Sequence, residues 1–112
     1  MNILENLAAV LTDLRIPFAT GHYGDVPPDT YVVIIPLADS FGLAADNKPQ
    51  IDVQEARLAL YSKDNYYPVR NKIVTALLAA DFTITDRRYI EFETDTGYHH
   101  YCVDVSKHYE ME

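Results

Sequence analysis

The sequence predicts an α+β fold in which two helices pack on a mostly antiparallel sheet, in the order α-β-β-β-α-β-β. Three observations predict it: two apolar patterns at helical spacing, a β-branched apolar run, and two alternating segments that a tight turn joins. A chain of 112 residues holds one modest hydrophobic core. We therefore expect a single domain over residues 1–112.

The first helix is expected from about residue 3 to residue 15. Asn2 can cap it, with Glu5 three residues later as the return half of a capping box, and Pro17 stops it. Its apolar face consists of Ile3, Leu4, Leu7, Ala8, Leu11 and Leu14.

Three strands follow. Residues 18–20 are expected to form a short strand, and the β-branched run 31–35 predicts a strand that is buried on both faces. Residues 51–62 predict a long strand in which Ile51 and Val53 share one face while Ala56, Leu58 and Leu60 occupy the other. A bulge near residues 54–55 would reconcile the two halves.

Residues 37–50 contain turn residues and match no regular element, so they are expected to form a long loop. Such loops are often functional, and this one carries the apolar Phe41 and Leu43. Two interpretations stay open, a mobile surface loop and a loop that orders against a neighbouring subunit. On the second, the expected contact residues are Asp39, Phe41, Leu43, Asp46 and Lys48, together with Tyr98 and His100.

The second helix is expected to begin at Tyr67 and Pro68, because proline suits the first turn. Its buried stripe would be Val69, Ile73, Ala76, Leu77 and Ala80.

The last two strands form a hairpin around residues 94–97, in which Glu93 pairs with Tyr98. That register places Arg87 opposite Asp104 and Glu91 opposite His100, as favourable cross-strand pairs. The core face would hold Ile84, Ile90, Phe92, Tyr101, Val103 and Val105, and the other face Arg87, Tyr89, Glu91, Glu93, His100, Cys102 and Asp104. Residues 109–112 are expected to fray.

The formal net charge is −8, and lysine and arginine form no cluster, which disfavours nucleic-acid binding. No apolar run reaches the length of a membrane span, and the N-terminus lacks the pattern of a signal peptide, which favours the cytoplasm. Nine tyrosines and no tryptophan are a weak sign of contact surfaces.

No motif indicates catalysis, a cofactor or a metal. The adjacent His99 and His100 point to opposite faces of a strand and cannot share a metal, and Cys102 has no second cysteine to pair with. Glu91 and Glu93 lie two apart on one strand face, a spacing more typical of a solvated edge than of acid–base chemistry. The sequence thus favours a protein that is not an enzyme.

Residues 53–62 (VQEARLALYS), the tyrosine-rich start of the second helix with Val69, Ile73 and Leu77, and residues 89–101 (YIEFETDTGYHHY) carry a resemblance. The chain resembles the tail terminator, or tail-to-head joining, proteins of long-tailed phages and Gram-positive prophages. The resemblance implies a ring, typically hexameric, that caps the tail tube and meets the head completion protein. It also implies assembly in the bacterial cytoplasm and then a place in the virion.

In such a ring DNA passes through without specific binding, and an acidic wall keeps it from adhering. Glu91, Glu93 and Asp95 are the candidate channel acids. Two alternatives stay open: a small acidic protein-binding module, such as an inhibitor or an antitoxin-like protein, and, third, an enzyme of unknown type.

Overall fold

The computed structural model describes residues 2–24, 26–42, 44–45 and 48–111. Within these residues it contains two helices and a five-stranded, mostly antiparallel sheet in the predicted order, so the α+β class is confirmed. One addition is a pair of two-residue strands, β3 (Ala44–Ala45) and β4 (Lys48–Pro49), which pair with each other.

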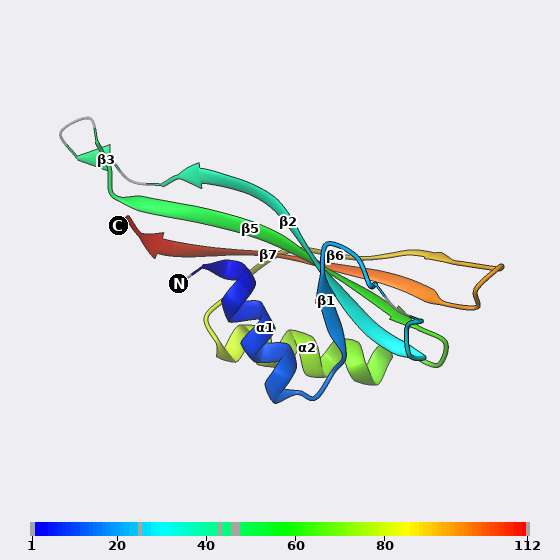
Figure 1. The fold of residues 1–112 in the computed structure, drawn as a ribbon. Coiled ribbons are helices and arrows are strands. Elements are labelled where there is room, and N and C mark those ends of the chain that lie inside the picture. Colours follow the sequence, from blue (N-terminus) through cyan, green and yellow to red (C-terminus); the bar gives the residue numbers. More distant parts are fainter. Residues whose placement is uncertain (1, 25, 43, 46–47, 112) are drawn as a thin grey trace.

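The strand order in the sheet is β1-β2-β5-β7-β6, and only the β1–β2 pair is parallel. Both helices cover the same face, and the sheet extends beyond them at both ends, which gives the molecule extents of 54 × 25 × 24 Å (Figure 1). The elements are α1 (Ile3–Asp13), β1 (Phe18–Thr20), β2 (Thr30–Phe41), β5 (Ile51–Ser62), α2 (Tyr67–Ala79), β6 (Thr83–Phe92) and β7 (His99–Glu110).

Both helix starts were predictable from the sequence. The Asn2 side chain caps α1, because its Oδ1 accepts a hydrogen bond from the Glu5 backbone N–H at 2.9 Å and its Nδ2 donates to Glu5 Oε1 at 3.0 Å. Helix α2 begins at Tyr67 with Pro68 in its first turn. Helix α1 ends at Asp13, two residues earlier than expected, and the chain turns through Arg15 at a φ of 59°.

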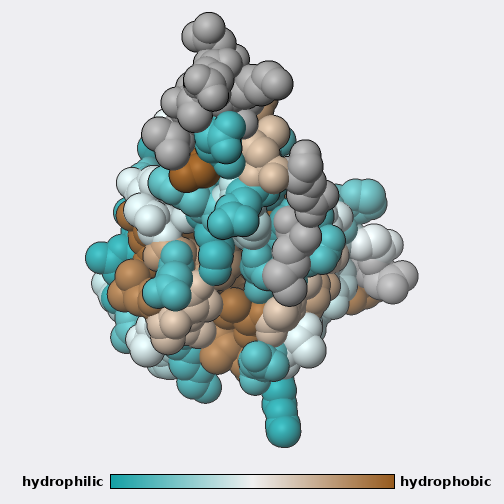
Figure 2. All heavy atoms as spheres, turned by 90° about the vertical axis from the view of Figure 1, so that its left-hand side faces the viewer, coloured by the Kyte–Doolittle hydropathy of each residue, from teal (hydrophilic) through white to brown (hydrophobic). Residues whose placement is uncertain are grey.

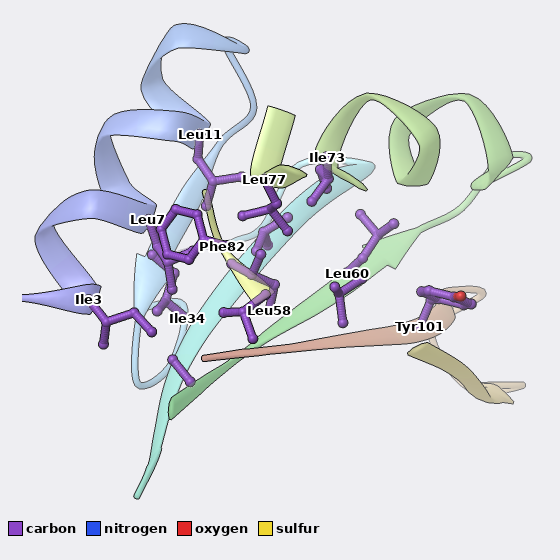
Figure 3. Close-up of a cluster of buried hydrophobic side chains, with 14 residues drawn as sticks. Ile3, Leu7, Leu11, Ile34, Leu58, Leu60, Ile73, Leu77, Phe82 and Tyr101 are labelled. Atoms are coloured by element: carbon purple, nitrogen blue, oxygen red, sulfur yellow. The ribbon is translucent and has the colours of Figure 1, made fainter. Parts of the chain in front are cut away.

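The main core lies between the two helices and the sheet (Figure 3). Leu7 and Leu11 of α1 and Ile73 and Leu77 of α2 are at most 1% exposed, as the helical spacing predicted. The sheet supplies the opposite wall through Val32, Ile34, Ala56, Leu58, Leu60, Tyr101, Val103 and Val105.

The expected loop over residues 37–50 is wrong in its first part. Strand β2 continues to Phe41 by pairing with β5, with Ala38 opposite Glu55 and Phe41 opposite Asp52. The local sequence does not predict a strand here, but pairing with β5 supplies hydrogen-bond partners for the backbone of these residues. Pro36 is tolerated because β1 pairs only with residues 32–34, so β2 is an edge strand beyond them.

The bulge expected at residues 54–55 is also wrong, because β5 and β7 pair in one register along their whole length. The irregularity lies on the partner strand, between Pro36 and Ala38 of β2. A plain two-residue alternation puts Val53 and Ala56 on opposite faces without any bulge.

The hairpin of β6 and β7 follows the predicted register only near its turn. The Glu93 N–H donates to the Tyr98 carbonyl at 2.8 Å, and Glu91 is opposite His100. Two register shifts follow along β6, and the first, between Glu91 and Tyr89, places Arg87 opposite Val103 instead of Asp104. A bulge adds one residue to the strand, so the side chains beyond it point to the opposite face of the sheet from the one expected. The alternation of apolar and polar residues in the sequence does not reveal where such a bulge occurs.

The predicted core face of this hairpin is therefore only partly confirmed. Tyr101, Val103 and Val105 are buried, whereas Ile90 is 41% and Phe92 47% exposed. Tyr89, expected on the face opposite Tyr101, is its direct partner. Strand β6 is the edge of the sheet, and its outer part extends beyond the helices (Figure 1).

The C-terminal strand holds more residues than expected. Strand β7 reaches Glu110, and the Tyr109 hydroxyl donates a hydrogen bond to Asn6 Oδ1 of α1. The Met111 N–H donates to the Gln50 carbonyl at 3.1 Å. The expected fraying of residues 109–112 is thus wrong for 109–111, because strand pairing and one partly buried tyrosine hold them.

Candidate functional site

The face of the sheet opposite the helices, here called the open face, carries a second small apolar cluster. Val33, Ala59 and Cys102 lie side by side on β2, β5 and β7 and are buried. Tyr31, Ile35 and Tyr61 pack around them and remain partly accessible. The accessible parts of Tyr31, Ile35 and Tyr61 give this face, which neither helix covers, an apolar surface suited to contact.

Five aromatic side chains gather at one end of the open face. We call them the tyrosine cluster: Tyr23, Tyr31, Tyr61, Tyr98 and His100. Strand register brings three of them together, because Tyr61 is opposite both Tyr31 and His100. The three residues lie far apart in the sequence, at positions 31, 61 and 100, which hides this grouping from sequence inspection.

The rings of the tyrosine cluster meet in stacked and edge-on pairs. Tyr31 and Tyr61 stack with centroids 4.9 Å apart, and Tyr61 and His100 stack at 4.3 Å. Tyr98 meets Tyr31 edge-on at 5.4 Å, and Tyr23 leans on Tyr31 at 5.0 Å. Such contacts hold the rings in fixed relative positions.

Tyr98 anchors the hairpin turn to the rest of the molecule. Its hydroxyl donates to the Pro28 carbonyl at 2.8 Å, which links the start of β7 to the connection between β1 and β2. Its exposed fraction is 6%, so little of the Tyr98 surface predicted for contact is accessible in this chain. His100 is half-buried against Tyr61.

A hollow of about 310 Å³ opens beside these rings. It is lined by Gly21, His22, Tyr23, Pro27, Tyr31, Val33, Ile35, Tyr61 and Glu93. Burial, with the neighbouring Tyr61 hydroxyl, raises the pKa of Tyr31 to about 12, and burial also raises the pKa of Tyr61. The phenols of Tyr31 and Tyr61 are therefore neutral at physiological pH, and the formal negative charge of the hollow comes from Glu93.

The three candidate channel acids lie together at the tip of the β6–β7 hairpin. A shallow hollow of about 410 Å³ there is lined by residues 91–96, which include Glu91, Glu93 and Asp95. Glu93 Oε1 accepts a hydrogen bond from Thr96 Oγ1 at 2.8 Å. The structure thus gathers these acids, and their role at a channel stays a prediction.

The contact residues predicted on the other hairpin lie at the opposite end of the sheet. Asp39 and Phe41 are on the exposed outer part of β2, and Phe41 is 69% exposed. Lys48 belongs to β4, although its side chain lies outside the described part of the chain, as do Leu43 and Asp46 entirely. Figure 2 views this end and shows hydrophobic side chains gathered mainly at the level of the helices.

Sequence reasoning missed the apolar surface on β6. Tyr89, Ile90 and Phe92 are 42%, 41% and 47% exposed along the edge strand. The alternation had assigned Ile90 and Phe92 to the core. The available signal was Glu91 and Glu93, whose charges lie between and beside these apolar positions.

No site for metal chemistry is apparent where the structure is described: His, Cys, Asp and Glu form no group of three or more that could hold an ion. Across the same residues, neither helix is long and apolar enough to cross a membrane. His99 and His100 point to opposite faces, as expected, since His99 contacts Tyr66 and His100 contacts Tyr61.

Comparison with known proteins adds no assignment. No protein-family model and no curated protein matches this chain.

Proposed function

We propose that this chain is a structural virion protein of a phage or prophage, similar to tail terminators. In this role it forms a ring that caps the tail tube and joins it to the head. The observation that supports the proposal is that the two ends of one elongated sheet each expose apolar side chains, and that these side chains differ between the two ends. Phe41 is exposed at one end, and Ile90 and Phe92 are exposed at the other.

Two different surfaces at opposite ends of a subunit favour head-to-tail contact. Contacts of this kind close into a ring when the rotation between neighbours is suitable. Burying the exposed side chains of Phe41 and Phe92 would contribute about 3 kcal/mol before the cost of ordering. The bulges of β6 keep its exposed edge from pairing indiscriminately.

The proposed partners are further copies of the chain, the tail tube protein and the head completion protein. The subunit assembles in the host cytoplasm and then becomes part of the virion. DNA passes through the ring without specific binding, because a chain of net charge −8 repels a polyanion. The acids at the β6–β7 tip, Glu91, Glu93 and Asp95, are the proposed wall of this channel.

Sedimentation velocity across protein concentrations tests the ring. Phe41→Ser and Phe92→Ser should each lower the assembled fraction, while Val26→Ser, at a residue 94% exposed between β1 and β2, should not. An equimolar mixture of the two defective variants should form dimers but no ring, because each retains one intact end. A strict monomer at high concentration would contradict the proposal.

Salt dependence gives a second test of assembly. Copies with the same net charge repel one another, and salt screens that repulsion over a Debye length of about 8 Å at physiological ionic strength. Ring formation should therefore strengthen as salt is added. Dissociation of the ring by salt would show that complementary charges hold it.

The channel is tested separately by charge reversal. Replacing Glu91 and Asp95 with Lys should leave the ring intact and create DNA binding that weakens with salt. Wild-type protein should show no DNA binding at moderate salt. Binding by the wild type under those conditions would contradict the channel role.

The open face favours a second candidate, a small acidic module that binds a basic protein. Its tyrosine cluster and hollow suit protein contact without any ring. Solution size separates the two candidates, since the module would remain a monomer or a dimer.

A further inference from the structure

We propose that the hollow on the open face binds an arginine side chain presented by a basic segment of a partner protein. The hollow combines three tyrosine rings with one carboxylate, Glu93. This inference goes beyond the proposed ring and does not depend on it, because every lining residue belongs to one copy of the chain.

The walls of the hollow match the chemistry of a guanidinium group. Tyr23, Tyr31 and Tyr61 supply aromatic surface, which attracts arginine through cation–π contact and stacking. Tyr23 and Tyr31 meet at an interplanar angle of 59°, which forms a concave corner. Val33 and Ile35 add apolar lining suited to the methylene stem of a long side chain.

The charge of the hollow favours a cation over any anion. Glu93 is the carboxylate in its lining, and it is close enough to disfavour ionisation of both Tyr31 and Tyr61. A carboxylate beside neutral phenols offers charge-assisted hydrogen bonds to a guanidinium. Glu91 lies nearby on the same hairpin, and the lining residues include no lysine or arginine.

The same chain already places cations over its aromatic rings elsewhere. Lys63 Nζ lies 5.0 Å from the centroid of Tyr98, and the Arg70 guanidinium lies 4.3 Å from that of Tyr67. Lys63 covers the Tyr98 side of the tyrosine cluster, so the arginine approaches from the side of Tyr23. A volume of about 310 Å³ is at the lower limit of ordinary ligand pockets, which suits one side chain.

The partner is expected to be a basic protein and not a second copy. Each copy carries a net charge of −8, so two copies repel one another, whereas a basic segment is attracted over long range. The occupant is therefore a segment of opposite charge, with one arginine in the hollow and its neighbours beside the acids of the β6–β7 tip.

The test uses a short glycine–serine peptide with three arginines and a matched peptide in which citrulline replaces each arginine. Binding is followed by NMR shifts of the full-length protein, made with Phe92→Ser so that ring formation cannot occlude the face. The arginine peptide should shift signals of Tyr31, Tyr61 and His100, and the citrulline peptide should not. Equal binding of the two peptides would overturn the proposal.

Two variants locate the site. Glu93→Gln should weaken arginine-peptide binding about tenfold, and Tyr23→Leu should weaken it as well. Asp95→Asn is the matched control, because it removes the same charge from the same hairpin tip but does not line the hollow. An equal loss in Asp95→Asn and Glu93→Gln would indicate general attraction and overturn the site. Shifts of the same signals with protein concentration alone would assign the face to a second copy and also overturn it.

Discussion

Arg57 on β5 and Asp104 on β7 form a bidentate salt bridge on the open face. Arg57 Nε donates to Oδ1 of Asp104 at 2.7 Å, and Nη2 donates to Oδ2 at 3.0 Å. The two residues are direct partners in the strand register, and their side chains are 28% and 13% exposed. The hydrogen bonds to Asp104 raise the pKa of Arg57, so the guanidinium stays charged across the accessible pH range.

Asp104→Asn should lower the free energy of unfolding by about 1–2 kcal/mol, because it leaves a largely buried guanidinium without its charged partner. Asp86→Asn is the matched control. Asp86 pairs with Arg88 at 3.1 Å, but those side chains are 47% and 60% exposed, so the loss should be below about 0.5 kcal/mol. Urea denaturation measures both. Equal losses would show that burial of the Arg57 pair has no energetic effect.

Val103→Asp should prevent folding or destabilise the protein by several kcal/mol, because Val103 is 1% exposed in the main core. An unpaired carboxylate there must remain charged in an apolar site or take up a proton. Val26→Asp, at a position 94% exposed, should change stability by less than about 0.5 kcal/mol. Circular dichroism during thermal unfolding compares them. Wild-type stability of Val103→Asp would mean that this face of β7 is not core.

The free energy of unfolding should decrease as the pH is lowered from neutrality, because of His100. Burial lowers its pKa from the usual 6.5, while Glu93 and Glu91 act in the opposite direction. The unfolded chain therefore binds the proton more readily, so the stability present above pH 6.5 is lost as pH falls through the lowered pKa. His100→Asn should flatten this dependence in urea titrations between about pH 8 and about pH 5. His108→Asn, at an exposed position, controls for the loss of one histidine. An unchanged slope in His100→Asn would assign the effect to other groups.

Gly97→Ala should cost about 1 kcal/mol, although space around the added methyl group is free. Gly97 closes the β6–β7 turn at a φ of +82°, a conformation that residues with a side chain adopt only under strain. Gly24 also has free space but no positive φ, so Gly24→Ala should be neutral or slightly stabilising. Chemical denaturation of both variants checks the contrast, and equal effects would contradict the backbone explanation.

The parts of the fold that depend on neighbouring residues could be predicted from the sequence. The Asn2 cap, Pro68 at the start of α2 and the pairing of Glu93 with Tyr98 each follow from contacts within a few positions. The buried stripe with Ile73 and Leu77 follows from helical spacing.

The errors have one common physical cause, which is pairing between strands that are distant in sequence. Whether β2 continues past Pro36 depends on β5, and the face of Tyr89 depends on the register shift between Tyr89 and Glu91 of β6. A local pattern contains no information about where an extra residue enters a strand.

The candidate site also contains one part that could be predicted from the sequence and one part that could not. The acids at the hairpin tip could be named because they are adjacent in sequence. The hollow could not, because Tyr23, Tyr31 and Tyr61 come together only when β2 and β5 pair and the segment before β2 folds over them. Tyr98 was expected to contact a partner, but its hydroxyl binds Pro28 within the same chain.

The position of Cys102 gives this protein a natural chemical reporter. It is the sole cysteine of the chain, it is 3% exposed in the strand between β5 and β6, and burial raises the pKa of its thiol. A thiol-modifying reagent can therefore reach it only when the sheet opens, so the modification rate measures that opening without any engineered label. Because Cys102 lies beneath the open face, any molecule that covers this face will slow the same reaction.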